Sequence, residues 1–82
     1  MERHEIVPTI MEYFKNTRRD GVKYKRCYIM FSTNSMTIYV RNFWGRCLSN
    51  FSIDYTDIEE IILNSACLHI PFTGGVYSVY FK

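Results

Sequence analysis

The stretch SIDYTDIEEI, residues 52–61, decides how the second half of this sequence folds. Thr56 and Glu59 have the spacing of a helix capping box, which predicts a helix from about Asp57. The residues before Thr56 alternate as in a strand, and no helical period continues beyond residue 64. We therefore favour a strand at IEEIIL, residues 58–63, allowing one helical turn at 57–60, and keep a helix as the alternative.

Upstream of this stretch, apolar residues recur at every second position from Val22 onward. The alternating segments are separated by the turn sequences STNS at 32–35 and FWGR at 43–46, and a last one, GVYSVYF, begins at Gly75. This pattern predicts an antiparallel meander with one dry face. The residues expected in its core are Ile29, Phe31, Ile38, Val40, Phe51, Ile53, Val79 and Phe81.

The N-terminal segment has a helical period instead. Its apolar stripe consists of Ile6, Val7, Ile10, Met11 and Phe14. Proline is tolerated in the first turn of a helix, so Pro8 predicts a helix over about 5–16. The expected fold is α+β: one N-terminal helix packed on a mainly antiparallel sheet of about five strands. We expect a single domain, 1–82, with its β-rich region at 22–82.

Aromatic residues make up 17% of the 82 residues, with six Phe, seven Tyr and one Trp. This content excludes a disordered chain. A domain of this size cannot bury so many large rings, and exposed Tyr and Trp are common anchors of protein interfaces. The composition therefore predicts a binding protein.

Charge is unevenly distributed although the net charge is only +2. Residues 15–26 hold six basic side chains and one acidic side chain, whereas residues 54–60 hold four acidic side chains and no base. Such a charge distribution can steer the approach of a partner. The candidate partner-binding residues are Arg18, Arg19, Lys23, Lys25, Arg26, Tyr39, Arg41, Phe43, Trp44 and Arg46.

Each candidate feature also has a purely structural alternative. The basic run and the acidic run can each be a solvated turn, and the Trp44 ring can fold back over the open end of the sheet. Interleaving of Tyr24 and Tyr28 with basic residues fits a platform on which nucleic-acid bases stack.

No catalytic, cofactor or metal site is expected. His4 and His69 have no nucleophile at a recognisable spacing, and the three cysteines lack the spacing of a zinc site or a disulfide framework. They predict buried apolar thiols in a reducing compartment. With no leader sequence and no apolar run near 20 residues, we expect a cytoplasmic protein that is not an enzyme.

Residues 27–61 resemble the core of bacterial pleckstrin-homology-like and GRAM-like domains. The resemblance rests on Thr33-Asn34, on Ile38-Tyr39-Val40 and on the step Tyr55 to Ile61. It implies a half-barrel that binds anionic lipid through its first hairpin. That family closes its barrel with a C-terminal helix, whereas this sequence predicts a strand there and a helix at the N-terminus.

The functional hypothesis is a small protein that acts by occupying the surface of a protein partner. A phage or mobile-element inhibitor of a host or defence complex is one form of it. The alternatives are an adaptor that binds anionic lipid at a membrane surface and a nucleic-acid-binding protein. The strand at 76–81 carries no charge, so it also predicts a homodimer formed through a sheet edge.

Overall fold

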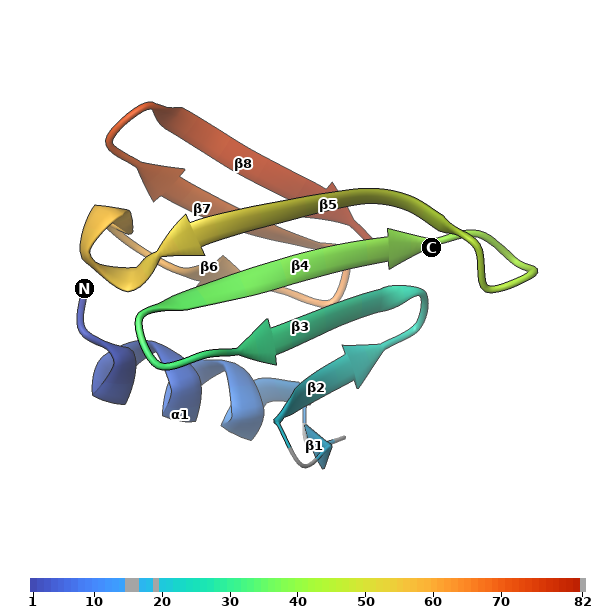
Figure 1. Ribbon diagram of the computed structural model, residues 1–82, viewed down its shortest axis with the longest axis horizontal. Helices are drawn as coiled ribbons and strands as arrows, with labels where there is room; N and C mark the ends of the chain where they lie inside the picture. The colour runs from blue at the N-terminus through green and yellow to red at the C-terminus, as the bar shows by residue number, and fades with distance from the viewer. Residues whose placement is uncertain (15–16, 19, 82) are drawn as a thin grey trace.

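In the part of the chain that the structure describes, one N-terminal helix is followed by two antiparallel sheets (Figure 1). The structure is a computed structural model and describes residues 1–14, 17–18 and 20–81. Sheet A contains, in spatial order, β1 (Thr17–Arg18), β2 (Gly21–Tyr24), β3 (Cys27–Phe31), β4 (Ser35–Arg41) and β5 (Cys47–Asp54). Sheet B contains β6 (Ile62–Leu63), β7 (Cys67–Phe72) and β8 (Gly75–Tyr80).

The helix α1 spans Arg3–Phe14 and buries Ile6, Ile10 and Phe14. It begins two residues before its predicted start, so the placement of Pro8 in the first turn was wrong. Pro8 lies in the second turn with its ring exposed, where its missing N–H removes one helical hydrogen bond. The apolar stripe offsets this loss by packing on the core. The predicted helix end falls on residues 15–16, outside the described residues.

Sheet A contains the predicted meander from β3 to β5, while the turn at residues 25–26 that separates β2 from β3 was not predicted. The register of sheet A aligns the apolar residues of neighbouring strands. Ile29 pairs with Ile38, and Ile38 pairs with Phe51, so the three side chains share the inner face. The outer face carries Tyr28 opposite Tyr39, with Lys23 and Asn50 on either side of them. Because the side-chain period of a strand is two, this register separates a dry face from a polar face.

The stretch at 52–61 is neither a helix nor a continuous strand. Tyr55–Asp57 forms one 3-10 turn, Ile58 bridges to Phe72, and β6 begins only at Ile62. The capping-box interpretation was wrong: Asp54 precedes the turn without a side-chain cap bond, and Thr56 lies within the turn. The turn ends at Ile58 because this residue is extended and bridges to Phe72, and the N–H of Glu59 donates to the Pro71 carbonyl oxygen at 2.9 Å.

The division into two sheets corrects the expected single sheet of about five strands. The α+β class, the N-terminal helix and the antiparallel pairing are confirmed. Among the described strands, β5 is one edge strand of sheet A and β8 one edge strand of sheet B. Their side chains meet without ladder pairing: the rings of Phe51 and Tyr77 stack with their centroids 4.3 Å apart.

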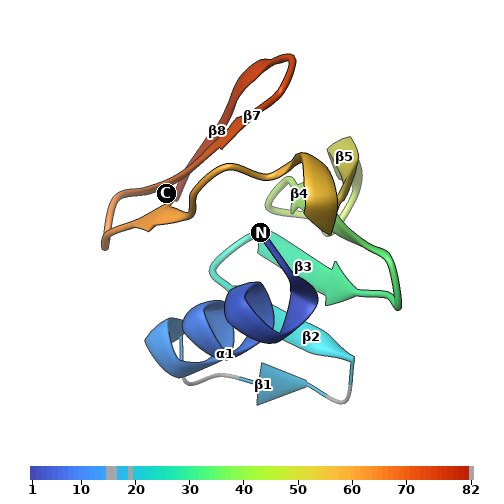
Figure 2. The same cartoon turned by 90° about the vertical axis from the view of Figure 1, so that its left-hand side faces the viewer.

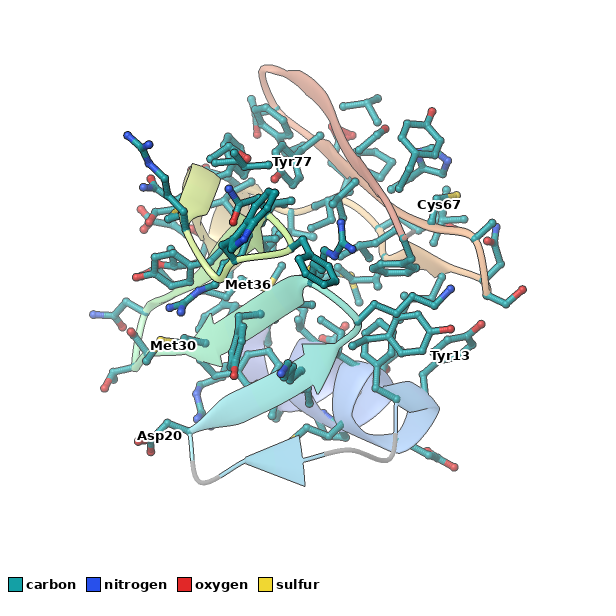
Figure 3. The ribbon with its side chains drawn as sticks, turned by 90° about the vertical axis from the view of Figure 1, so that its right-hand side faces the viewer. Tyr13, Asp20, Met30, Met36, Cys67 and Tyr77 are labelled. Atoms are coloured by element: carbon teal, nitrogen blue, oxygen red, sulfur yellow. The ribbon has the colours of Figure 1, made fainter. Side chains whose placement is uncertain are left out.

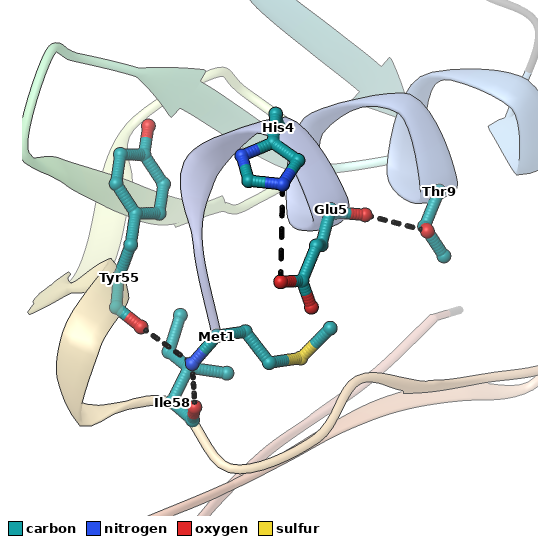
Figure 4. A network of polar contacts seen from close by, with 6 residues as sticks. All are labelled: Met1, His4, Glu5, Thr9, Tyr55 and Ile58. Carbon is teal, nitrogen blue, oxygen red and sulfur yellow. Dashed lines mark hydrogen bonds and ion pairs between the residues drawn. The ribbon is translucent and has the colours of Figure 1, made fainter.

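The core lies between sheet A on one side and α1 with sheet B on the other (Figure 2). Six of the eight predicted core residues are buried, while Val40 and Phe51 are only half-buried. At one end of α1, the Met1 amino group donates to the carbonyl oxygens of Ile58 at 2.6 Å and Tyr55 at 3.3 Å (Figure 4). This contact fastens the start of the helix to the segment that joins the two sheets.

Candidate functional site

The β2–β3 and β4–β5 turns lie at the same end of sheet A (Figure 1). Lys25 and Arg26 form the whole β2–β3 turn, because Tyr24 and Cys27 on either side are still paired. Lys25 has a φ of 53°, a left-handed conformation that two-residue hairpin turns require. The turn therefore presents two successive cations beyond the last strand pair.

The β4–β5 turn is organised by Asn42. Its side-chain oxygen accepts hydrogen bonds from the backbone N–H groups of Trp44 at 3.0 Å and Arg46 at 2.9 Å. Gly45 has a φ of +83° and donates its N–H to the Asn42 carbonyl oxygen at 3.0 Å. These bonds define the backbone of the turn and leave the side chains of Phe43 and Trp44 pointing away from the core.

Phe43 and Trp44 are the most exposed large apolar side chains of the described residues. Their exposed fractions are 73% and 85%, and their rings meet edge to face with centroids 5.5 Å apart. The alternative that the Trp44 ring covers the open end of the sheet is therefore wrong. An exposed Leu48 lies just beyond the turn on β5. This apolar surface contributes little to the fold, since it remains in water.

Cations surround the aromatic rings at this end. The Arg41 guanidinium lies 5.1 Å from the centre of the Tyr28 ring and the Lys23 ammonium 5.4 Å from it. The Arg26 guanidinium lies 5.5 Å from the centre of the Phe43 ring. Distances under about 6 Å are those of cation–π contacts. Two of these cations share the Tyr28 ring, so the aromatic and positive groups form one continuous surface at this end.

Two hollows open beside these rings. One, of about 210 Å³, is bounded by the β2–β3 and β4–β5 turns and the Tyr28 ring. The other, of about 260 Å³, lies between Leu48 of β5 and the chain from Val79 to Phe81. Arg26, Arg41 and Asn42 line both hollows. No described lining residue of either hollow is acidic, so both present a positive potential to a ligand.

Most of the predicted partner-binding residues come together here. Lys23, Lys25, Arg26, Arg41 and Phe43 line the smaller hollow. Trp44 and Arg46 lie in the β4–β5 turn, and Tyr39 lies on the outer face of sheet A opposite Tyr28. Arg18 lies in β1, away from this end, while Arg19 falls outside the described residues. The alternative in which Tyr24 and Tyr28 together form a stacking platform was wrong, because Tyr24 packs inward on Phe14 and Phe81.

Sequence reasoning missed two features of the site, the role of Asn42 and the contribution of Leu48 to an exposed surface. The Asn42 role had a local signal, since Asn three residues before Gly is typical of a turn held by its own side chain. The exposure of Leu48, at 63%, had no such signal in the local sequence.

The acidic run lies at the opposite end of β5 (Figure 1). Asp54, Asp57, Glu59 and Glu60 are all exposed around the 3-10 turn and the start of the link to β6. A strand of eight residues separates this acidic end from the β4–β5 turn, which corresponds to about 25 Å. The described part of the molecule therefore has one basic end and one acidic end.

No family model matches the chain, and neither the curated proteins nor the solved structures searched contain a match. The resemblance to pleckstrin-homology-like and GRAM-like domains therefore stays a prediction. Over the described ranges, no group of three or more His, Cys, Asp and Glu side chains is placed to hold a metal ion. A helix long and apolar enough to cross a membrane is also not found among them.

Proposed function

We propose that this chain is a non-enzymatic binding protein that recognises an acidic surface on a protein partner. The contact is made by the basic aromatic end, comprising Lys23, Lys25, Arg26, Tyr28, Arg41, Phe43, Trp44 and Arg46. The observation that carries the proposal is the exposure of Phe43 and Trp44, at 73% and 85%, among several cations. Aromatic residues and arginine are the side chains most enriched at the energetic centres of protein interfaces.

Preorganisation supports this proposal. The two hydrogen bonds to the Asn42 side chain hold the β4–β5 turn before any partner arrives. Binding therefore does not have to pay for ordering a loose loop. Separation of the basic end from the acidic run also supports it, because a dipolar molecule is oriented by the field of a charged partner as it approaches.

An anionic membrane surface is the second candidate, in keeping with the resemblance to lipid-binding domains. Phe43, Trp44 and Leu48 are exposed together, and basic side chains lie beside them. Aromatic rings partition into the interfacial region of a bilayer, and lysine and arginine are attracted to anionic headgroups. This surface is small, so the membrane proposal ranks below a protein partner.

Nucleic acid is the third candidate, with a different observation behind it. Tyr28 and Tyr39 lie directly opposite each other on the outer face of sheet A, beside Lys23 and Arg41. Rings on a sheet with flanking cations can stack on the bases of a single strand. The form of the hypothesis in which the chain is a phage or mobile-element inhibitor stays a prediction.

The test is capture of a partner on the immobilised chain from lysates of the source organism and of any host it infects. We expect one stoichiometric protein that is lost on Trp44→Ala and on Arg26→Glu with Arg41→Glu. Loss of a central aromatic contact costs about 2 kcal/mol or more, which is about a 30-fold rise in Kd. Raised salt should weaken capture, since the charges lie in an exposed rim.

Matched controls use the same kinds of change elsewhere. Tyr13→Ala removes another exposed aromatic ring, from α1, and Glu59→Lys with Glu60→Lys reverses charge at the acidic end. Both should retain the partner. The proposal is overturned if anionic vesicles or a single-stranded oligonucleotide bind saturably at physiological salt, need the same residues, and no protein is captured.

A further inference from the structure

We infer that the outer face of sheet B carries a nucleophilic thiol site in which Cys67 is the nucleophile, His69 its base and Ser78 the residue that positions the base. The co-reactant is a small neutral disulfide. Cys67 and His69 alternate along β7 and therefore project from the same face. Ser78 of β8 pairs with His69, and Tyr80 of β8 pairs with Cys67. Figure 3 shows Cys67 on the side of sheet B opposite the inward-facing Tyr77.

The three polar groups form a chain of hydrogen bonds. The Cys67 Sγ lies 3.1 Å from His69 Nε2, and His69 Nδ1 lies 2.6 Å from Ser78 Oγ. When Nδ1 carries the imidazole proton and donates it to Ser78, Nε2 is free to accept the proton of the thiol. A nucleophile within hydrogen-bond reach of a base, with that base oriented by a third group, is the arrangement of an activated nucleophile.

The turn before β7 holds the cysteine in place. The Asn64 side-chain oxygen accepts the backbone N–H groups of Ala66 at 2.8 Å and Cys67 at 2.9 Å. It also lies 3.6 Å from the Cys67 Sγ, a longer contact than the one to His69. The stronger partner of the thiol is therefore the imidazole.

The exchange balances without any further reagent. His69 Nε2 takes the proton from the Cys67 thiol, and the resulting thiolate attacks one sulfur of the disulfide. A new sulfur–sulfur bond forms to Cys67 while the old bond breaks, and the departing thiolate recovers the proton from His69. The products are a mixed disulfide on the protein and one molecule of the small thiol.

Access to Cys67 depends on Tyr80. Cys67 is itself buried, but its neighbour Tyr80 is 65% exposed and meets the His69 ring edge to face at 5.9 Å. Exposed side chains change rotamer within picoseconds to nanoseconds, so the ring can move aside for a small reagent. The reagent therefore has to be small, which is why a neutral disulfide with two carbons on each sulfur is the appropriate probe.

The other two cysteines are internal controls. Cys27 is buried in the core, where desolvation raises the pKa of its thiol to about 11. Cys47 is exposed, contrary to the expectation that all three thiols are buried, and its Sγ lies 3.4 Å from the Ser49 carbonyl oxygen. A carbonyl oxygen cannot take up the thiol proton as an imidazole nitrogen can. The three cysteines therefore allow a comparison within one chain: Cys67 lies beside a base, Cys47 is exposed and Cys27 lies in the core.

The experiment treats the folded chain with bis(2-hydroxyethyl) disulfide at pH 7, quenches by alkylation and measures the mixed disulfide at each cysteine by mass spectrometry. An ordinary thiol is only a few per cent thiolate at pH 7, and the lower nucleophilicity of a stabilised thiolate offsets part of the gain from a base. We expect Cys67 to react about tenfold faster than Cys47, and Cys27 to be the slowest.

His69→Gln should lower the Cys67 rate about tenfold, and the exposed His4→Gln should leave it unchanged. Ser78→Ala should lower the rate about threefold, and Ser78→Thr, which keeps the hydroxyl, should restore it. If His69→Gln lowers the thermal midpoint of unfolding, the comparison of Ser78→Ala with Ser78→Thr tests the inference instead, because Ser78 is an exposed residue. A Cys67 rate no greater than that of Cys47, or equal rates in Ser78→Ala and Ser78→Thr, overturns the inference.

Discussion

At position 42, one amide oxygen accepts the backbone N–H groups of two residues, Trp44 and Arg46. That single side chain determines the conformation of the turn on which the proposed function depends. The rings of Phe43 and Trp44 stay exposed because the backbone of the turn, which Asn42 holds, sets where they project. At the scale of the residue, the exposed aromatic surface thus depends on hydrogen bonds between the turn backbone and the side chain of Asn42.

Cys27 gives a prediction at the same scale. Burial raises the pKa of its thiol from 9.0 to about 11, so the folded state keeps a proton that the unfolded state releases. Below pH 9 the thiol is protonated in both states and contributes no pH dependence. Between pH 9 and 11 unfolding releases the proton, so the free energy of unfolding falls as pH rises, by roughly 2 to 3 kcal/mol in total.

Urea denaturation at several pH values between 8 and 11 measures this effect. Cys27→Ala should flatten the fall in stability, whereas the exposed Cys47→Ala should keep the slope of the parent chain. Part of the difference comes through Tyr77, whose pKa is raised mainly by burial and further by the charge of Cys27. Identical slopes in the parent chain and Cys27→Ala would contradict the assignment.

At the scale of the element, the packing of β2 on β3 leaves no room for a side chain at Gly21. A Cβ atom at this position would overlap the backbone carbonyl oxygen of Ile29, and the strands cannot separate because Val22 and Ile29 are buried on their inner face. This glycine is therefore required for close approach. Its strand also begins directly after Asp20, whose carbonyl oxygen accepts the N–H of Phe31 at 2.9 Å.

Gly21→Ala should therefore lower the free energy of unfolding by about 2 kcal/mol or more, because a backbone atom has to shift within a packed sheet. The measurement is urea denaturation followed by far-UV circular dichroism. Asp20→Ala, one residue earlier and exposed, changes no packed contact and should cost under about 0.5 kcal/mol. Equal stability of the two variants would show that β2 and β3 are not packed as described.

At the scale of the whole molecule, the edge of sheet B matters most. The sequence predicts strand 76–81 as a sheet edge, and β8 is one of the two edge strands of sheet B in the described part of the chain. Val76 on this strand is 62% exposed. An uncharged edge strand offers unpaired backbone groups to a second copy. The homodimer itself stays a prediction.

Light scattering over a range of concentrations tests that prediction. The parent chain should show a mass that rises from monomer towards dimer, and Val76→Lys should remain a monomer because a charge on the edge opposes pairing. Ile62→Lys, at the other edge strand of sheet B, is the matched control and should associate like the parent chain. A monomer at every concentration rules out the dimer.

Local sequence patterns were sufficient to predict the helix, the main strands and part of the candidate site. The spacing of apolar residues changes from a period of 3.6 to a period of 2 near residue 21, which separates the helix from the strands. Short segments show these periods because each follows from the local backbone geometry of a helix or a strand. The turn sequences at 32–35 and 43–46 then predict the meander, and they place Arg41 and Trp44 at one end of it. The turn at Lys25–Arg26, which brings Lys23 and Arg26 to the same end, was not predicted, because residues 24–31 alternate like one strand.

Only the tertiary structure decided the division into two sheets and the conformation of residues 52–61. Whether β8 pairs with β5 or packs on it depends on contacts between residues far apart in sequence, such as Phe51 and Tyr77. The local signal of Thr56 and Glu59 did not produce a helix, because Ile58 and Glu59 pair with the distant residues Phe72 and Pro71 of β7 instead. The meeting of Cys67 and His69 with Ser78 likewise needed the register of β7 and β8, which sequence alone does not specify because a slip of one residue would place Ser78 on the other face.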